Sequence, residues 1–373
     1  MLIGVPREIK PQEFRVGLTP ESVAELTHRG HSVLVEAGAG TGIGAGDDAY
    51  RSAGARITED AANIYGSAEL IVKVKEPQPA ERRLLREGQV LFTYLHLAPD
   101  PDQARDLIGS GTVCIAYETV TDAHGGLPLL RPMSQVAGRM AVQAGACALE
   151  KEHGGRGVLI GGVPGVAPAR VVILGGGTVG FNAAQMAVGL QADVTLLDRD
   201  PAVLERLSNH FGASVRAVYS NRTTIQEHLY HASLVIGAVL VPGAAAPRLV
   251  TRSHLAEMLP GAVLVDVSID QGGCFETSRP TTHAQPTFVA EGIVHYCVAN
   301  MPGAVPHTST YALNNATLPH ILALADKGWR QAMRQDPHLR AGMNVCAGQV
   351  THHAVAQALG YPLVDPDDLL ADP

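Results

Sequence analysis

The stretch RVVILGGGTVGFNAAQMAVGLQADVTLLDRD, residues 170–200, constrains the fold more than any other part of the chain. An apolar strand pattern leads directly into Gly175, Gly177 and Gly180, which form G-x-G-x-x-G, and a helix pattern follows. The first glycine permits a tight turn, the second lets the backbone approach a pyrophosphate, and the third lets the helix pack closely on the strand. The next strand ends in Asp198, 23 positions after Gly175, near the spacing of about 20 expected of a ribose-binding acid. The stretch predicts a βαβ unit that binds NAD rather than NADP, because the Asp198 carboxylate would repel a 2′-phosphate.

Strand and helix patterns alternate along the chain, which predicts two mostly parallel sheets covered by helices. The expected strands lie at 2–9, 31–37, 69–75, 90–97 and 112–120, and then at 170–177, 192–198, 214–220, 233–241, 262–268 and 292–300. Between the two sets, an Ala-rich segment at about 134–153 predicts one long helix with Ser134 as its N-cap.

We therefore predict an α/β protein with two Rossmann-like, doubly wound parallel-sheet domains that flank a cleft. The first, a substrate or catalytic domain, is expected to comprise residues 1–133 together with the helical tail, 305–373. The second, an NAD-binding domain, is expected at 134–304 and is entered through the long connecting helix.

The composition excludes several classes of partner. A net charge of −8 argues against nucleic acid and anionic membrane surfaces, and no apolar run is long enough to span a bilayer. The start of the chain reaches charged residues at once, unlike a signal peptide. The five cysteines are widely spaced and form no C-x-x-C pair, which argues against disulfides and zinc sites. We expect a cytoplasmic protein that binds small molecules and no metal.

Two of the chain's five lysines, Lys73 and Lys75, share the expected strand at 69–75. One explanation is that lysines on an edge strand prevent edge-to-edge aggregation. Lys75 also stands at the carboxyl end of its strand, where open parallel sheets bind their ligands. Both explanations are open for the pair on this pattern alone.

Three other residues stand at the expected element ends. Arg15 lies in the loop before a helix, His96 lies near the end of the strand at 90–97, and Asp270 follows the strand at 262–268. Taken singly, Arg15 could be a solvated loop charge, His96 a hydrogen-bonded structural histidine, and Asp270 a turn cap before glycine. Together with Lys75 they supply a cation for a carboxylate and acid–base groups for a small 2-oxo or 2-amino acid.

Over essentially its whole length the sequence resembles the L-alanine dehydrogenases. The resemblance is carried by GVPREIKPQEFRVGLTPESV, VKVKEP, YLHLAP, RPMSQVAGRMA, VPGVAPARVVILGGGTVG, LVDVSIDQGGCFETSRPTTHAQPTF and VANMPGAVPHTSTYALNNATLP. It implies NAD-dependent, reversible oxidative deamination of L-alanine to pyruvate and ammonia. It further implies that Arg15 and Lys75 bind the substrate and that His96 and Asp270 are catalytic.

The resemblance also implies a set of cofactor contacts and a homohexamer. The contacts fall on Ser134, Gly175, Gly177, Thr178, Val179, Gly180, Asp198, Ser220, Val239, Leu240, Val267, Ser268, Ile269, Asp270, Arg279, Val298, Ala299, Asn300 and Met301. One departure is Val203, which stands where the family often has a basic residue near the adenosine.

Three alternatives to the alanine dehydrogenase activity remain. The related NAD-binding subunit of proton-translocating transhydrogenase exchanges cofactor without amino-acid chemistry. A related dehydrogenase would act on another small amino acid or, as a lysine- or saccharopine-type enzyme, on a larger substrate. A catalytically silent NAD-binding regulator would bind NADH without alanine-dependent turnover.

Overall fold

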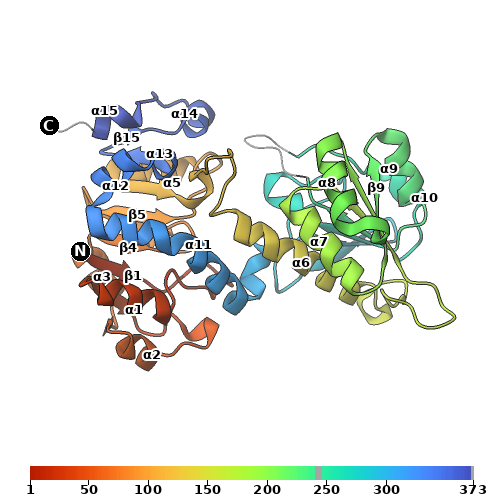
Figure 1. Cartoon of the computed structure of the whole chain (residues 1–373), viewed down its shortest axis with the longest axis horizontal. Helices are drawn as coiled ribbons and strands as arrows, with labels where there is room; N and C mark the ends of the chain where they lie inside the picture. The colour runs from red at the N-terminus through yellow and green to blue at the C-terminus, as the bar shows by residue number, and fades with distance from the viewer. Residues whose placement is uncertain (240–245, 371–373) are drawn as a thin grey trace. The chain divides into compact units, whose positions relative to one another are not determined.

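The computed structural model describes residues 1–239 and 246–370. Its contacts divide the chain into two compact units, Met1–Met133 with Gly303–Pro373, and Ser134–Pro302. The second junction lies two residues before the expected position, 305. In each unit a mostly parallel sheet is covered by helices (Figure 1). The predicted α/β fold is therefore confirmed.

The sheet of the first unit has eight strands in the order β15-β14-β6-β5-β4-β1-β2-β3. The strands are β1 (Leu2–Val5), β2 (Ser32–Glu36), β3 (Arg56–Thr58), β4 (Leu70–Val72), β5 (Val90–Thr93), β6 (Val113–Ala116), β14 (Met343–Cys346) and β15 (Gln349–Val350). Strands β1 to β6 are parallel, and β14 adds antiparallel to β6 from the C-terminal part of the chain. The expectation that this tail is helical throughout is therefore wrong, because β14 and β15 extend the sheet. Since β2 and β3 lie on one side of β1 and β4 to β6 on the other, this sheet is doubly wound.

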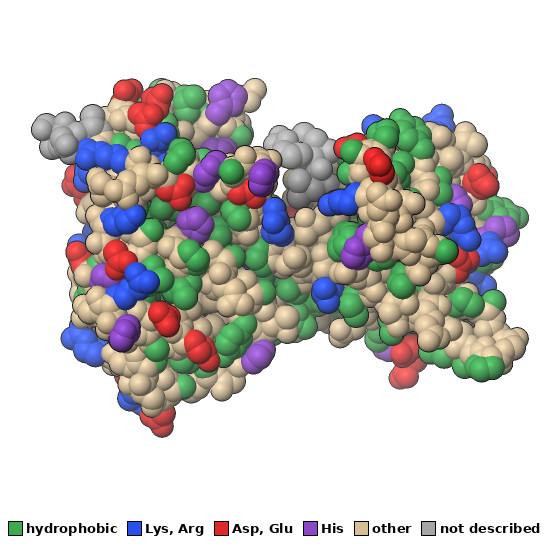
Figure 2. Space-filling view, in the orientation of Figure 1, with side chains coloured by type: hydrophobic (Ala, Val, Ile, Leu, Met, Phe, Trp, Pro, Cys, Tyr) green, Lys and Arg blue, Asp and Glu red, His purple; other side chains and the backbone are tan. Residues whose placement is uncertain are grey.

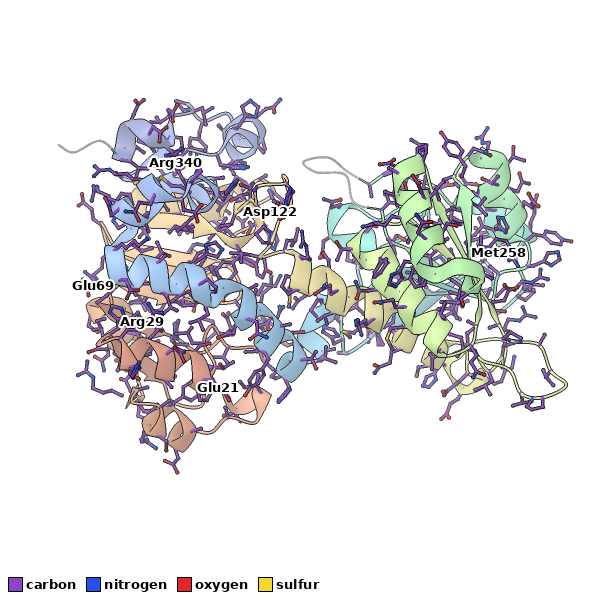
Figure 3. The ribbon with its side chains drawn as sticks, in the orientation of Figure 1. Glu21, Arg29, Glu69, Asp122, Met258 and Arg340 are labelled. Atoms are coloured by element: carbon purple, nitrogen blue, oxygen red, sulfur yellow. The ribbon has the colours of Figure 1, made fainter. Side chains whose placement is uncertain are left out.

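The helices of the first unit come from both ends of the chain. They are α1 (Pro20–His28), α2 (Asp47–Ser52), α3 (Ala61–Ser67), α4 (Pro79–Arg82), α5 (Pro101–Ser110), α11 (Pro306–Lys327), α12 (Trp329–Gln335), α13 (Pro337–Arg340), α14 (His353–Leu359) and α15 (Pro366–Leu370). Helix α1 is capped by Thr19, whose side chain accepts from the N–H of Ser22, and Pro20 occupies its first turn. Arg29, which is labelled in Figure 3, follows the last residue of α1 and pairs with Asp326 of α11 at 2.8 Å.

The second unit has seven strands in the order β12-β13-β11-β10-β7-β8-β9. They are β7 (Arg170–Leu174), β8 (Asp193–Asp198), β9 (Val215–Tyr219), β10 (Leu234–Gly237), β11 (Val263–Asp266), β12 (Thr287–Ala290) and β13 (Ile293–Tyr296). All six expected strands are present and parallel, whereas the antiparallel edge strand β12 is not among them. Helices α7 (Thr178–Gly189), α8 (Pro201–Phe211), α9 (Arg222–Leu229) and α10 (Arg252–Glu257) complete the unit.

The connecting helix α6 spans Arg131–Ala148, three residues earlier at its start than expected. The prediction that Ser134 caps it is wrong, because Ser134 lies inside the first turns; Pro132 stands near the N-terminus, where a missing N–H is tolerated. Its small residues permit close packing, as the sequence indicates. A Cβ on Gly138 would lie 2.2 Å from the carbonyl oxygen of Val179 in α7.

The surface carries both signs of charge. On the face drawn in Figure 2, basic and acidic side chains are interspersed over the two units. None of the helices in residues 1–239 and 246–370 is both long enough and apolar enough to cross a membrane.

Candidate active site

Arg15 is buried, so the alternative that it is a solvated loop charge is wrong. Only 2% of its surface is exposed, and Glu13 holds it through two parallel hydrogen bonds. Nε donates to Oε1 at 2.7 Å and Nη2 donates to Oε2 at 2.6 Å, while Nη1 lies 3.1 Å from the sulfur of Met133. Burial by itself lowers the pKa of Arg15, but the Glu13 carboxylate outweighs burial and leaves the pKa raised. The guanidinium is therefore a fixed, permanently charged group.

The loop that carries Arg15 is fastened to the end of strand β4. Gly17 of this loop packs closely on the end of β4, since a Cβ on Gly17 would be 2.3 Å from the carbonyl oxygen of Val72. Helix α11 fixes the same loop, since Asn314 accepts from the N–H of Thr19 at 2.9 Å and donates to the carbonyl of Gly17 at 3.0 Å. The fold thereby brings the Arg15 loop to the carboxyl end of β4, which Lys75 follows closely.

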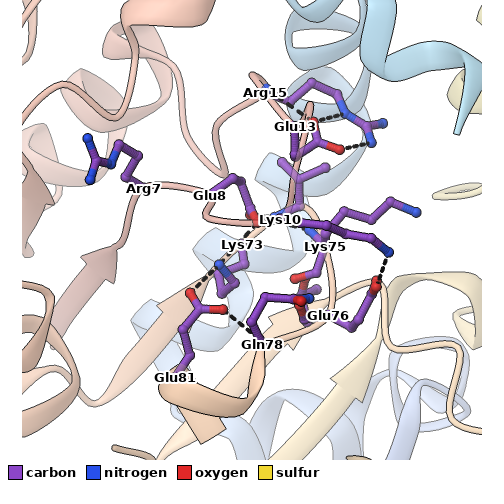
Figure 4. A network of polar contacts seen from close by, with 12 residues as sticks. Arg7, Glu8, Lys10, Glu13, Arg15, Lys73, Lys75, Glu76, Gln78 and Glu81 are labelled. Carbon is purple, nitrogen blue, oxygen red and sulfur yellow. Dashed lines mark hydrogen bonds and ion pairs between the residues drawn. The ribbon is translucent and has the colours of Figure 1, made fainter. Parts of the chain in front are cut away.

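Lys73 does not guard an edge, and that expectation is wrong. Strand β4 lies inside the sheet between β1 and β5, and Lys73 has 0% exposure. Its ammonium donates to Glu8 at 3.1 Å and to Glu81 at 2.7 Å (Figure 4). The hydroxyl of Tyr65 also donates to Glu81, at 3.0 Å. Burial alone lowers the pKa of Lys73, but Glu8, Tyr65 and Glu81 together more than offset this and leave the pKa raised, so Lys73 stays protonated.

Lys75 lies beyond the regular strand and is half-buried. Its N–H is 3.3 Å from Oε1 of Glu8, and its carbonyl accepts from the hydroxyl of Thr93 at 2.9 Å. In Figure 4 the side chains of Lys75 and Arg15 extend toward the same side, away from the cluster around Lys73. Two cations therefore project from neighbouring backbone segments, an arrangement suited to an anionic substrate.

Among the described residues no hydrogen bond to the side chain of His96 is present, which argues against the alternative of a hydrogen-bonded structural histidine. Its side chain is 46% exposed, and its Nδ1 lies 3.8 Å from Oε1 of Glu118, beyond hydrogen-bond length. Its ring stacks on Tyr94 at 5.8 Å between centroids. The backbone is left-handed, with φ of 49°, a conformation held by Glu118, whose Oε1 accepts from the His96 N–H at 2.6 Å. Glu118 escaped the sequence analysis, because a lone carboxylate after a strand carries no distinctive pattern.

The structure confirms the predicted roles of Gly175 and Gly180, whereas the approach of a pyrophosphate to Gly177 stays a prediction. Gly175 has φ of 102°, and a Cβ there would lie 2.6 Å from the carbonyl oxygen of Ala238. A Cβ on Gly180 would lie 1.8 Å from the carbonyl oxygen of Gly175, so helix α7 packs directly on the turn. A Cβ on Gly177 would meet nothing within 4 Å, which leaves room at the start of α7 for a phosphate group. This cradle fits a dinucleotide.

Asp198 ends β8 beside the glycine turn, with its Oδ2 accepting from the N–H of Gly176 at 2.6 Å. Val203 packs on the same turn: a Cβ on Gly176 would lie 2.6 Å from its Cγ1. One helical turn further along α8, Arg206 donates to the carbonyl of Gly176 at 2.9 Å. A basic side chain is thus present near the turn, three residues after Val203, and the sequence analysis missed it.

Asp270 is exposed in the 3₁₀ segment Val267–Gln271 that follows β11. The cap of this segment is Asp266, which accepts from the N–H of Ser268 at 3.1 Å and of Cys274 at 2.9 Å. Burial raises the pKa of Asp266, while bonds from Ser278 and from the Cys274 amide oppose the rise. The turn-capping role considered for Asp270 therefore belongs to Asp266, a residue that the sequence analysis missed.

The remaining expected cofactor contacts are spread over the second unit. Ser220 donates its N–H to the carbonyl of Asp198 at 2.8 Å, and Ser268 donates its hydroxyl to the carbonyl of Val239 at 2.7 Å. Arg279 is exposed and lies 4.2 Å over the ring of Phe288. Leu240 lies outside the described residues. The others are Ser134 in α6, Thr178 and Val179 at the start of α7, Val267 and Ile269 after β11, and Val298, Ala299, Asn300 and Met301 after β13.

One group of metal-ligating types lies outside these regions. Cys147, Glu150 and His153, all exposed at the end of α6, place one potential ligand atom each within 4.8 Å of one another. The sequence predicts no metal site, and exposed groups of this kind are common without a metal ion.

Two family models match the chain. The model described as "Alanine dehydrogenase/PNT, N-terminal domain" matches residues 4–137, and "Alanine dehydrogenase/PNT, C-terminal domain" matches residues 141–353.

Individual proteins are similar over the whole length. The alanine dehydrogenase of Halomonas elongata is 58% identical, covering 99% of this chain and 100% of its own. The alanine dehydrogenase of Mycobacterium tuberculosis is 53% identical, with 100% of both chains covered. Among solved structures, an L-alanine dehydrogenase matches with a TM-score of 0.94 and 52% identity, covering 96% of this chain and 99% of its own. A transhydrogenase from Sinorhizobium meliloti matches with a TM-score of 0.83 and 25% identity, covering 94% and 100%.

Proposed function

The chain belongs to the alanine dehydrogenase/PNT family, and from that premise we propose that it interconverts L-alanine with pyruvate and ammonia. The observation that carries the proposal is the pair of cations at the end of β4. Arg15 is buried and held by Glu13, while Lys75 projects from the adjoining segment. A small 2-amino or 2-oxo acid offers a carboxylate to one cation and a reacting oxygen to the other.

Arg15 is proposed to bind the substrate carboxylate. A guanidinium carries five N–H donors, and Glu13 occupies one of its edges through Nε and Nη2. The end of the fork formed by Nη1 and Nη2, where Nη1 contacts the sulfur of Met133, is proposed to take the substrate carboxylate in bidentate fashion, with the carboxylate replacing the sulfur. Lys75 then polarises the developing carbonyl.

A bound nicotinamide supplies the hydride acceptor for Cα of alanine and the donor in the reverse direction. We propose NAD, because Asp198 stands beside the glycine turn, where a ribose hydroxyl is favoured over a 2′-phosphate. His96 is proposed to move protons as water adds to the imine and ammonia leaves. Its exposed ring and its neighbour Glu118 support that role. Asp270 is proposed as a second group, orienting water or ammonia.

A cytoplasmic location and a homohexamer also belong to the proposal, on the resemblance to the family. The transhydrogenase alternative is weaker, because the full-length relatives at 53–58% identity carry the name alanine dehydrogenase. An alternative within the same chemistry is another small amino acid as substrate.

A panel of amino acids with NAD and, separately, with NADP tests the proposal directly. We expect L-alanine and NAD to produce NADH, which is measured by its absorbance. With NADP, the rate of reduced cofactor formation is expected to be much lower. Tight NADH binding without turnover of any amino acid would instead identify a cofactor-binding module.

A further inference from the structure

Burying the charges of Glu8, Lys73 and Glu81 costs free energy of desolvation, so a contribution to stability alone does not explain why this cluster is present. Both carboxylates and the ammonium are buried, with exposures of 8%, 4% and 0% for Glu8, Glu81 and Lys73. Removing charges from water is unfavourable, and an apolar replacement of such a group is often as stable. A buried cluster at the end of β4 therefore calls for another role.

The two oxygens of the Glu8 carboxylate have different partners, and those of Oε1 indicate that role. Its Oε2 accepts from Lys73, whereas its Oε1 accepts from the N–H of Val74 at 2.7 Å and faces that of Lys75 at 3.3 Å. The last residue of β4 is Val72, and its neighbour β1 pairs with it only as far as Ile71. The Glu8 carboxylate thus takes the place of a strand partner for the two residues that lead to the Lys75 side chain.

The other side of the same segment is fixed by β5 and its extension. Val74 accepts at its carbonyl from the N–H of Tyr94 at 3.3 Å, and Lys75 accepts from the hydroxyl of Thr93 at 2.9 Å. The donors of the segment point to Glu8 and its acceptors point to β5. Glu8 and β5 therefore hold the segment from opposite sides.

We propose that Glu8 is a positioning residue of the substrate site, which fixes the backbone of Val74 and Lys75 while Lys73 balances its charge in the interior. The inference rests on the proposed substrate-binding role of Lys75. It predicts that the reach of the Glu8 carboxylate, more than its charge, sets the affinity for substrate.

Two conservative variants separate reach from charge. Glu8→Asp keeps the charge beside Lys73 but is one methylene shorter, so it cannot hold both the ammonium and the two amides. Glu8→Gln keeps an oxygen for the amides but presents no charge to Lys73. Glu81→Gln is the matched control, because Glu81 also bonds Lys73 but accepts from the N–H of Gln78 instead of the Lys75 segment.

The full-length enzyme is assayed with L-alanine and with pyruvate plus ammonia, alongside melting temperature and NADH affinity. We expect Glu8→Asp to raise KM for L-alanine and for pyruvate by about tenfold, which is the change in affinity expected when hydrogen bonds to a charged group are lost. Glu8→Gln is expected to lower the melting temperature while raising KM by less than Glu8→Asp. Glu81→Gln is expected to leave KM unchanged, and NADH affinity is expected to stay within about twofold throughout.

Amide hydrogen exchange of a peptide that spans residues 72–76 provides a readout independent of activity. Exchange is expected to quicken at Val74 and Lys75 in Glu8→Asp but not in Glu81→Gln. The proposal would be overturned if Glu8→Asp had a native KM and native amide exchange. It would also be overturned if KM and exchange changed equally in Glu8→Asp and Glu81→Gln. If the native enzyme forms no NADH with L-alanine, the proposed function fails, and the exchange result still decides whether Glu8 positions the segment.

Discussion

Glu13 and Arg15 form a two-bond ion pair in which both side chains are buried, with 0% and 2% of the side-chain surface exposed. Because the residues are only two positions apart, the loop itself brings the carboxylate to the guanidinium. The pair fixes the plane of the guanidinium before any substrate arrives. Pre-organisation of this kind lowers the entropic cost of binding a carboxylate.

The first prediction concerns the planar fork of Arg15. Arg15→Lys keeps a positive charge but cannot hold Glu13 by two parallel bonds and bind a second carboxylate end-on. We expect KM for L-alanine and for pyruvate to rise about tenfold or more, with NADH affinity unchanged. Arg7→Lys, at an arginine with 58% of its side chain exposed, is the control. Native KM values in Arg15→Lys would remove Arg15 from the substrate site.

The second prediction concerns cofactor choice. Asp198→Gly removes the carboxylate that we propose to bind a ribose hydroxyl, and also its bond to the N–H of Gly176. We expect weaker NAD binding and a higher ratio of NADP to NAD use, measured as kcat/KM for each cofactor. Asp193→Asn, at the opposite end of β8, should leave the ratio unchanged. A native enzyme that already prefers NADP would contradict the assignment of Asp198.

The third prediction concerns proton transfer by His96. If its exposed ring acts as general acid and base, His96→Ala should lower kcat by about 10²–10⁴-fold. NADH affinity and melting temperature should change little, because the nearest polar contact described for the ring is 3.8 Å long, from Nδ1 to Glu118. Near-native turnover in the folded variant would exclude the catalytic role.

The fourth prediction concerns acid stability. His295 is fully buried in β13, with Nδ1 3.0 Å from the carbonyl of Ile293 and Nε2 2.7 Å from the hydroxyl of Thr277. Burial lowers its pKa below the ordinary 6.5, so the native state keeps it neutral while the unfolded state protonates. Its contribution is therefore present above about pH 6.5 and is lost as pH falls below that value toward the lowered native pKa. Between about pH 7.5 and 5.5, the melting temperature of His295→Gln should fall by less than that of the native protein.

Local pattern was sufficient for much of the fold. The glycine turn, the strand that ends in Asp198 and the alternation on both sides depend on neighbours in sequence, and the structure contains them. Lys73 shows a property that local sequence pattern does not predict. Whether a strand is an edge or a centre depends on sheet order, which is set by contacts distant in sequence, so the same pattern fitted an edge guard equally well.

The carboxylates around the site could not be found for a related reason. Glu8, Glu13 and Glu118 have no motif of their own, and each gains its role from one cation or backbone segment that folding brings to it. Acidic residues in loops are usually exposed. Only the tertiary contacts to Arg15, to the Lys75 segment and to the backbone of His96 distinguish these three from the chain's other acidic residues.

The last prediction separates two aspartates that follow the same strand. Asp266 is buried and binds several donors of the turn after β11, whereas Asp270 is exposed at the end of that turn. Asp266→Asn should lower the melting temperature, because an amide cannot accept from all of these N–H and O–H groups. Asp270→Asn preserves shape and removes only charge, so we expect native stability, near-native NADH affinity and a kcat reduced by about 10²-fold or more. Melting temperature, NADH affinity and kcat of both variants decide the matter. A native kcat in Asp270→Asn would leave His96 as the acid–base candidate, whereas a loss of stability in that variant would make Asp270 a second structural support of the turn.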